Sequence, residues 1–401
     1  MKASEKYRFD RMEFAGSLGD LGTLLPLAMG MILVNRLDPL GVFFSIGLYY
    51  VFSGVYAGVT VPVQPMKVIG AYAVATGISA SAIAASAALM AGVLFVLGVT
   101  GAVTLVGKHV PKAVVRGVQL STGVLLVTQG VRFVAGTSSF QQMAGAAEPY
   151  LSVQAVGPVP LGLAIGVLAG AATLLLLNNR RLPAGLAVIL GGAALGAALG
   201  AWPGGGALVP GLHLPTLLPF GLPGGADATF ALFALVLPQT PMTLGNAVIA
   251  YADLSQDYFG RRSARVTYRF ACISMALANG VSFLLGGIPL CHGAGGLAAH
   301  FRFGARTAGS NLMIGGLFAA LAILWGDQAL ALLRFLPMAV LGVLLIYAGS
   351  QLALTLLDVK ERKDLFVAVL ILGITLASSL AWGFVIGIAA AWALKSRRLS
   401  V

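Results

Sequence analysis

Two short segments of the chain combine proline with polar or glycine residues in a way that suits anion binding. Residues 61–67 read VPVQPMK and residues 289–296 read PLCHGAGG. Proline disfavours helix at the residue before it but fits a first helical turn, so each segment should be extended and then begin a helix, near Pro65 and near His292. A helix N-terminus exposes unpaired N–H groups and about half a positive charge, which attract an anion. The candidate substrate-binding residues here are Gln64, Pro65, Met66, Lys67, His292, Gly293, Ala294 and Gly295.

Lys67 adds a full positive charge to this pair of segments. A lysine near the bilayer centre costs several kcal/mol unless it is paired or hydrated, so such a residue marks function by default. The alternative is that its flexible side chain extends to the membrane surface. If the helix begins at the middle of the membrane, Lys67 lies too deep for that, which favours a binding role.

Polar residues in two further apolar stretches complete the candidate set. Asp20 lies in SLGDLGTLLP, where it could pair with Lys67, carry a coupling proton or hydrogen-bond a loosened helix. Gln239, Thr240 and Asn246 lie in LPQTPMTLGN, where two prolines predict a second break in a helix. We assign Gln239 and Thr240 to substrate binding, and Asp20 and Asn246 to coupling or to structure.

The chain lacks the residue patterns of an enzyme or a metalloprotein. Its two cysteines, Cys272 and Cys291, form no Cys/His group with metal-ligand spacing. No hydrolase triad, Walker loop or catalytic carboxylate pair is recognisable, so neither a cofactor nor direct use of ATP is expected. His292 is interpreted either as a substrate contact or as a hydrogen-bonded structural histidine.

The elements that position these residues must lie in a membrane. Of the 401 residues 58% are apolar and 9% are charged, against about 25% charged in soluble proteins. The mean hydropathy is +0.93. This composition excludes a soluble enzyme, a disordered protein and a coiled coil, and it predicts an all-α polytopic membrane protein whose main surroundings are the lipid bilayer.

The apolar runs predict fourteen membrane segments, of which the third and tenth are too short to cross ~30 Å of hydrocarbon at ~1.5 Å per residue. The first seven are 14–34, 40–58, 66–79, 82–106, 113–132, 159–177 and 184–200. The second seven are 228–250, 266–285, 292–300, 308–325, 333–356, 364–378 and 380–395. Two long connections, 133–157 and 201–227, are predicted to be loops on the outer side.

The basic residues predict the orientation. If both termini are cytoplasmic, 21 of the 25 lysines and arginines fall on the inner side, and only Arg36, Arg132 and Arg334 fall on the outer side. Lys67 lies within the third segment. This distribution is a strong positive-inside signal and predicts a multi-pass protein of the cell (inner) membrane. It also accounts for the net charge of +12 without a nucleic-acid partner.

The two halves of the chain resemble each other at a nearly constant offset. The stretch from Val110 aligns with that from Leu336 at an offset of 226, and Pro62 aligns with Pro289 at an offset of 227. Seven segments per copy is an odd number, so residues 201–401 would repeat residues 1–200 upside down. Inverted repeats with a short interrupted segment at the same place in each half are typical of transporters.

Four strings identify the chain with a known family. SLGDLGTLLPL, VPVQPMK, LPQTPMTLGNAV and PLCHGAGGLAAHFRFGARTAG resemble the molybdate transporter family of plants and bacteria, over nearly the whole chain. That family is similar to the SulP sulfate permeases. The resemblance implies a core domain, residues 14–106 and 228–325, moving against a gate domain, residues 113–200 and 333–395. The motif positions that it implies are Asp20, Gln64, Pro65, Lys67, Gln239, Asn246, His292, Gly293 and Gly295. Unlike most SulP permeases, no STAS domain is expected after the last segment.

These observations predict a secondary active transporter that imports a tetrahedral oxyanion, molybdate, by alternating access. Sulfate has the same shape and charge and stays open as the substrate. An anion channel is a further alternative. A nucleobase–proton symporter is disfavoured, because that class typically has carboxylates where this chain has Gln239 and His292. Proton coupling through Asp20 or His292, and a homodimer, are left open.

Overall fold

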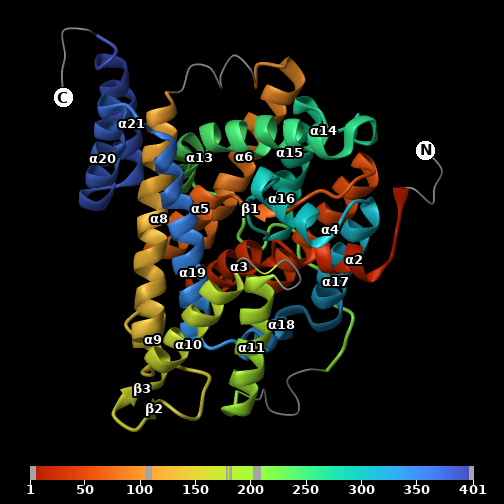
Figure 1. The fold of residues 1–401 in the computed structure, drawn as a ribbon, viewed down its shortest axis with the longest axis vertical. Helices are drawn as coiled ribbons and strands as arrows, with labels where there is room; N and C mark the ends of the chain where they lie inside the picture. The colour runs from red at the N-terminus through yellow and green to blue at the C-terminus, as the bar shows by residue number, and fades with distance from the viewer. Residues whose placement is uncertain (1–5, 104–110, 178, 180–182, 202–208, 397–401) are drawn as a thin grey trace.

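The computed structural model describes residues 6–103, 111–177, 179, 183–201 and 209–396. The end of the predicted segment 82–106, part of the predicted loop 201–227 and both chain termini lie outside these residues. Within them the chain is mostly helical (Figure 1). Seven helical stretches are long and apolar enough to cross a membrane: Pro39–Ala57, Ala80–Thr100, Lys112–Ala144, Gly225–Ser263, Tyr268–Leu285, Ala308–Gln328 and Met338–Asp358.

Individual helices make up these stretches. They are α4 (Pro39–Ala57), α6 (Ala80–Thr100), α8 (Lys112–Ala135), α9 (Ser139–Ala144), α12 (Gly225–Phe230), η1 (Ala231–Val236), α13 (Leu237–Met242), η2 (Thr243–Ala250), α14 (Tyr251–Phe259), η3 (Gly260–Ser263), α15 (Tyr268–Leu285), α17 (Ala308–Trp325), η4 (Gly326–Gln328), α19 (Met338–Ala353) and η5 (Leu354–Asp358).

Several further helices are each too short to cross the membrane. They are α5 (Lys67–Thr76), α16 (Ala294–Phe303), α10 (Leu161–Leu176), α11 (Ala184–Ala198), α18 (Ala329–Leu333), α20 (Arg362–Ala377) and α21 (Leu380–Ala393). The ten residues of α5 and of α16 reach ~15 Å, about half the hydrocarbon thickness, as expected for the third and tenth segments. Helices α10, α11, α20 and α21 have only 14–16 residues, so the described part of the chain does not confirm all fourteen predicted segments.

The first predicted segment, 14–34, is not one continuous helix. It consists of α2 (Arg11–Ser17) and α3 (Leu21–Asn35), which are bent by 46° relative to each other. Gly19 lies in the break, where an added Cβ would come within 2.9 Å of the Phe303 ring and 3.0 Å of the Ala299 carbonyl oxygen. The break therefore allows the chain to pass close to α16, and it leaves Asp20 at the N-terminus of α3.

The helix break predicted at Pro238 and Pro241 does not occur. The helical path continues from Gly225 to Ser263, with π-helical segments η1 and η2 on either side of the prolines. Neither proline has an N–H to donate to the carbonyl four residues before it. The wider π-helical turns on either side accommodate this irregularity, and the Thr240 hydroxyl donates to the Val236 carbonyl at 2.7 Å.

Four long helices form two crossed pairs within the bundle. Helix α4 packs against α17, and α6 packs against α15, while α8 and α19 run side by side along the length of the molecule (Figure 1). Glycine allows the closest approach between α8 and α19. A Cβ at Gly123 would lie 2.6 Å from the Gly349 carbonyl oxygen, and a Cβ at Gly349 would lie 2.6 Å from the Gly123 carbonyl oxygen. Small residues at helix interfaces are characteristic of membrane bundles.

Helix α19 begins beside a buried carboxylate from the 145–154 connection. Glu148 accepts hydrogen bonds from the backbone N–H groups of Met338 at 2.7 Å and Ala339 at 2.9 Å. Two of the N–H groups that a helix start leaves unpaired are thereby satisfied. Burial raises the pKa of the Glu148 carboxyl group to about 7, against these hydrogen bonds, which lower it.

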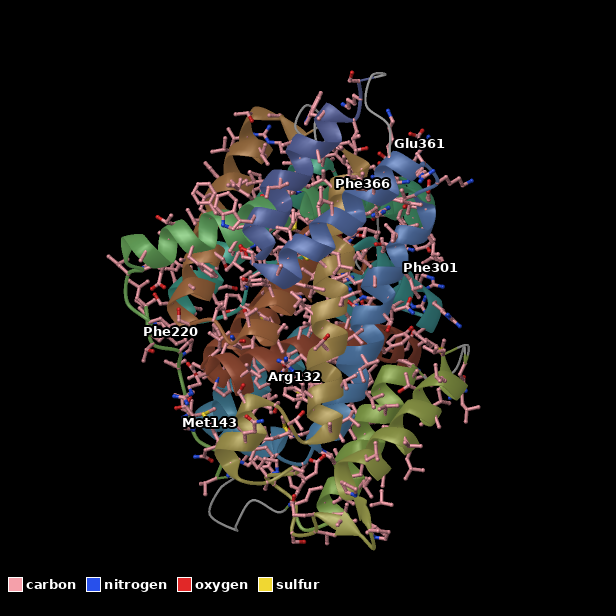
Figure 2. All side chains as sticks on the ribbon, turned by 90° about the vertical axis from the view of Figure 1, so that its left-hand side faces the viewer. Arg132, Met143, Phe220, Phe301, Glu361 and Phe366 are labelled. Carbon is pink, nitrogen blue, oxygen red and sulfur yellow. The ribbon has the colours of Figure 1, made fainter. Side chains whose placement is uncertain are left out.

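The outer surface of the helices is apolar, as contact with lipid requires. Leu175 on α10 is 82% exposed, and large hydrophobic side chains are also exposed on α20 and α21. Figure 2 shows Phe366 on the outward surface of α20, which with α21 packs against α8. An aqueous surrounding would not favour so much exposed hydrocarbon, so the structure agrees with the composition.

Candidate functional site

The candidate site is organised around two short strands that pair in the interior of the bundle. β1 (Gln64–Pro65) and β4 (Leu290–Cys291) pair antiparallel, with Gln64 opposite Cys291 and Pro65 opposite Leu290. The Met66 N–H extends this pairing by donating to the Pro289 carbonyl at 2.8 Å. β1 leads into α5, and β4 leads into α16 after two residues. Both short helices therefore begin in the same buried region (Figure 1).

The other two strands of the described chain lie away from this site. β2 (Ala155–Val156) and β3 (Val159–Pro160) form an exposed hairpin in the connection before α10. Their residues contact α10 and do not contribute to the buried β1–β4 pair.

The N-terminus of α5 is capped by a side chain from α13. The Gln239 Oε1 atom accepts hydrogen bonds from the backbone N–H groups of Val68 at 2.9 Å and Ile69 at 3.3 Å. Its Nε2 atom donates to the Thr243 hydroxyl at 2.9 Å. Two of the N–H groups in this first turn are thus occupied within the protein. Gln239 therefore positions the start of α5.

The N-terminus of α16 is open by comparison. No side chain caps it, and the first helical hydrogen bond there joins the Leu297 N–H to the Gly293 carbonyl. A Cβ at Gly295 would meet nothing within 4 Å, so the backbone at this position borders free space. Backbone N–H groups at such a helix start are donors for an anion. Ala294 is the first residue of the helix, next to these donors.

Glycine is required at the two positions that flank this open site. A Cβ at Gly296 would lie 2.6 Å from the Asp20 Oδ2 atom and 2.7 Å from the Gln64 Nε2 atom. A Cβ at Gly293 would overlap the Gln64 Oε1 atom. The α16 backbone therefore lies directly against the side chains of Asp20 and Gln64.

Asp20 and Gln64 form a buried hydrogen-bonded pair. The Gln64 Nε2 atom donates to the Asp20 Oδ2 atom at 2.6 Å, and both side chains are at least 96% buried. The Gln64 Oε1 atom is buried and has no hydrogen-bond partner. An unpaired buried acceptor costs about 1–3 kcal/mol, so this atom is suited to a donor that arrives in another state of the site.

The Lys67 side chain borders two cavities, and its charge interacts with the Asp20 carboxylate. Among the described residues it makes no hydrogen bond, and none of the three salt bridges involves it. One cavity, of about 360 Å³, is also lined by Asp20, Gln64 and Gly295. The other, of about 140 Å³, is also lined by Asn246. Since a water molecule occupies about 30 Å³, the larger cavity has room for a small anion with some of its water.

Helix α19 contributes to the opposite wall of both cavities, and α8 contributes only to that of the smaller one. Tyr347 and Gln351 line both cavities, and Gln119 lines the smaller one. These residues were not among those predicted from the sequence. Gln119 and Gln351 could have been noticed, because an amide within an otherwise apolar run is the same signal that identified Gln64.

Three predicted contacts lie behind the cavities. His292 is fully buried, with Nδ1 3.0 Å from the Pro62 carbonyl and Nε2 within 2.9 Å of the hydroxyls of Tyr49 and Ser274. Thr240 bonds the Val236 carbonyl, and Met66 is fully buried at the start of α5. The structure thus gathers Asp20, Gln64, Lys67 and Gly295 at one cavity, and it places Gln239, Thr240, Met66 and His292 in the surrounding layer.

Metal binding has no support in this region. Among residues 6–103, 111–177, 179, 183–201 and 209–396, no group of three or more histidine, cysteine and carboxylate side chains could hold a metal ion.

Comparison with known proteins gives consistent matches. A family model described as "Molybdate transporter of MFS superfamily" matches residues 12–126 and 231–352. Molybdate transporter 2 and Molybdate transporter 1 of Arabidopsis thaliana are 30% and 29% identical over 96% of this chain, which covers 88% and 89% of theirs. Molybdate transporter 1 of Chlamydomonas reinhardtii is 31% identical over 94% of this chain and 90% of its own.

Solved structures of anion transporters share the fold. SLC26A9 matches 96% of this chain with a TM-score of 0.64 and 15% identity, and this chain covers 65% of it. The transmembrane domain of the cyanobacterium bicarbonate transporter BicA matches 95% of this chain with a TM-score of 0.60 and 16% identity, and 97% of that domain is covered. Murine SLC26A9 in the inward-facing state gives a TM-score of 0.66 at 14% identity, over 97% of this chain and 69% of its own.

Proposed function

We propose that this chain, which belongs to the molybdate transporter family, is a secondary active transporter that imports molybdate and binds it beside Lys67 at the N-terminus of α16. The family and the fold shared with SLC26 anion transporters support anion transport, and the matched relatives are transporters and not enzymes. The observation that carries the site is the Lys67 ammonium group in the same cavity as the open backbone at Gly295.

The two groups supply different parts of the interaction. Lys67 compensates the charge of a dianion, while the N–H groups at the start of α16 donate hydrogen bonds to its oxygens. Gln239 caps α5, and His292 is hydrogen-bonded to a backbone carbonyl just before β1. Thr240 and Met66 lie in the layer of residues around the cavity. Direct contact of these four residues with the substrate stays a prediction.

An inverted repeat of seven segments per copy, residues 1–200 and 201–401, is part of the proposal. Two contacts support it, because each joins a residue to its own counterpart in the alignment of the halves. Gln64 pairs with Cys291, at an offset of 227, and Gly123 contacts Gly349, at an offset of 226. Such self-pairing is what a two-fold axis between the copies would produce.

Alternating access would follow from the position of the cavities. Lys67, Gln64 and Gly295 belong to the proposed core, residues 14–106 and 228–325, while Tyr347 and Gln351 belong to the proposed gate, residues 113–200 and 333–395. Movement of one domain past the other would expose the anion to either side in turn. The positive-inside distribution places both termini in the cytoplasm of a cell-membrane protein.

Proton coupling is proposed to act through Asp20 and Gln64. A protonated Asp20 would donate to the Gln64 carbonyl oxygen, so the Gln64 amide would rotate and turn its N–H₂ group toward the anion. Lys67 and Arg302 line the same cavity as Asp20. Asp20→Asn imitates the protonated form. We expect its uptake to become insensitive to a protonophore, whereas wild-type uptake should fall.

The test of the site is equilibrium binding to the purified protein. Isothermal titration with molybdate should give binding to wild type and to Lys360→Ala, a control at an exposed lysine, and none to Lys67→Ala. Competition by sulfate decides whether the substrate is molybdate alone or tetrahedral dianions in general. Wild-type affinity in Lys67→Ala would overturn the site, and transport that does not saturate would favour a channel.

A further inference from the structure

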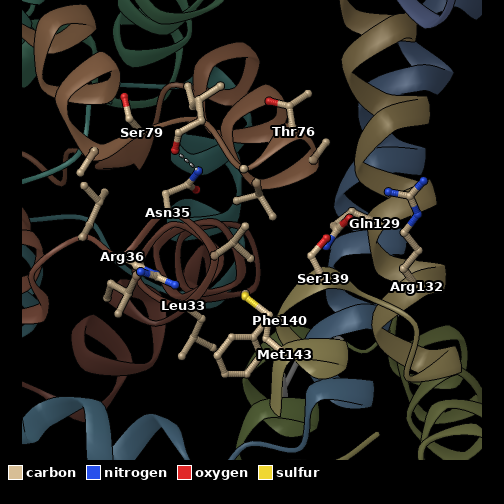
Figure 3. Close-up of a pocket in the computed structure, with 18 of the residues that line it drawn as sticks. Leu33, Asn35, Arg36, Thr76, Ser79, Gln129, Arg132, Ser139, Phe140 and Met143 are labelled. Carbon is tan, nitrogen blue, oxygen red and sulfur yellow. Dashed lines mark hydrogen bonds between the residues drawn. The ribbon is translucent and has the colours of Figure 1, made fainter. Parts of the chain in front are cut away.

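A second, larger cavity lies next to the candidate site, at the end of the molecule where α3 and α5 end. It has a volume of about 1150 Å³ and is lined by the ends of α3, α5 and α8, by α9 and by Tyr150 (Figure 3). Its charged lining residues are Arg36 and Arg132, with no carboxylate among them. The cavity is therefore electropositive.

The two arginine side chains have no hydrogen-bond or salt-bridge partner within the described part of the chain. Among the described residues, no hydrogen bond or salt bridge involves the side chain of Arg36 or Arg132, and both are exposed. In the view of Figure 3 they lie on opposite sides of Gln129 and Ser139. Arg334, at the same end of the molecule, instead lies over the Tyr150 ring at 5.5 Å. Two arginines that lack such a partner among the described residues thus line the same cavity.

The backbone at Arg36 is held in an unfavourable conformation. Its φ of 58° lies in the left-handed region, where residues other than glycine are uncommon. The neighbouring Asn35 fixes this end of α3, because its Nδ2 atom donates to the carbonyls of Ala73 at 2.9 Å and Ile78 at 2.8 Å. The arginine is therefore positioned by a tight connection between α3 and α5, and is not on a free loop.

The large cavity lies further along α3 and α8 than the small cavity beside Lys67. On α8, Leu126 lines the small cavity beside Lys67, and Gln129 lines the large one. On α3, Leu27 lines the small cavity and Ile32 lines the large one. Three residues of helix correspond to ~4.5 Å, so about one turn separates the two cavities along α8.

We infer that Arg132 and Arg36 form an anion-collecting site that concentrates the oxyanion before it reaches Lys67. This inference rests on the proposed function, and it adds the outer route and its residues. Guanidinium groups stay charged and donate several hydrogen bonds to an oxyanion. Arg36 also borders a cavity that contains Asp38 and Asp327, which offset its charge. Arg132 should therefore contribute more than Arg36.

The positive-inside rule supports this inference. Basic residues are disfavoured on the outer side of a membrane protein, yet two of the three arginines predicted to lie there line one cavity. A role in attracting anions from the medium explains why they are present. It also predicts that their effect acts on the association rate and depends on salt, as electrostatic steering does.

The test is the initial rate of labelled molybdate uptake into intact cells at low and physiological ionic strength. At about 0.01 M salt, we expect Arg132→Gln with Arg36→Gln to raise the apparent KM roughly 3- to 10-fold. At about 0.15 M the Debye length falls from ~30 Å to ~8 Å, and the difference should shrink below about 2-fold. Arg132→Lys should retain most of the wild-type rate, and Arg334→Gln should match wild type.

Two further measurements separate the possible failures. Equilibrium binding of molybdate to the purified double variant should stay within about 2-fold of wild type, because the central site is intact. Uptake by inverted vesicles should be unaffected, because the effect belongs to one face. A wild-type KM at low salt, or an equal loss from both faces, would overturn the inference. Failure of wild type itself to bind molybdate would overturn the proposed function instead.

Discussion

The N-termini of α5 and α16 reach the same buried region, yet they are completed in different ways. In α5 the Gln239 side chain occupies the N–H groups of Val68 and Ile69, and Lys67 supplies the positive charge. In α16 no side chain caps the helix, and the backbone at Gly295 borders free space. In the proposed site, the start of α5 would supply the positive charge and the start of α16 would supply the hydrogen-bond donors.

Removing the charge should have the largest effect on anion affinity. Lys67→Ala leaves a dianion beside hydrogen-bond donors but without a compensating charge in a low-dielectric cavity. We expect a loss of at least about 100-fold, equal to about 2.7 kcal/mol, because interactions between charged groups are strong there. Titration calorimetry of the variant beside Lys360→Ala measures it. A loss below about 3-fold would mean that α16 alone binds the anion.

Closing the open helix start should have the next largest effect. Gly295→Ala adds a methyl group that meets no protein atom within 4 Å but occupies the space next to the α16 backbone. We expect about a 10-fold loss of molybdate affinity with little change in thermal stability. Gly316→Ala on α17 is the matched control, because its added methyl group also meets nothing within 4 Å. Equal affinities of the two variants would show that the anion does not approach Gly295.

Removing the α5 cap should act mainly on stability. Gln239→Ala leaves the Val68 and Ile69 N–H groups unpaired, at about 1–3 kcal/mol for a buried unsatisfied group. We expect a lower thermal midpoint and only about a 3-fold loss of affinity, since Lys67 and α16 remain. Gln239→Glu keeps the acceptor and should restore stability while its negative charge weakens anion binding. A variant that lost affinity without losing stability would make Gln239 a direct ligand.

The smallest effect on affinity is expected at the cap of α19, which forms the opposite wall. Burial raises the pKa of Glu148 to about 7 from 4.5, so the folded state binds the proton more tightly than the unfolded state. Stability should therefore decline as pH rises from about 4.5 to about 7, by at most about 3 kcal/mol, and level off above that. Thermal unfolding of Glu148→Gln should lack this decline, with molybdate affinity within about 2-fold of wild type.

The sequence predicted the short helices well because their signals are local. Prolines 62 and 65 and the glycines after Cys291 determine where the chain is extended and where a helix begins, and the structure begins α5 at Lys67 and α16 at Ala294. The pairing of the two extended segments was not predicted, because it depends on contacts between residues more than 220 positions apart.

The parts that were missed depend on packing between elements. Nothing in the sequence near Gln239 indicates that its side chain reaches the N-terminus of α5, or that π-helical turns carry the helix past two prolines. Tyr347 and Gln351 face Lys67 only because α19 lies across the cavity. The fourteen predicted segments are not confirmed as fourteen helices, because hydropathy marks apolar runs and does not show where a helix ends.

The pairing of β1 and β4 has a consequence for how the protein can change over time. The pairing uses main-chain atoms, as in the bond from the Met66 N–H to the Pro289 carbonyl, so it does not depend on the side chains of these residues. Side chains on the two strands can therefore change during evolution while the strands stay paired. At the adjoining start of α16, Gly293 and Gly296 are exceptions, because a Cβ at either would meet a buried polar side chain.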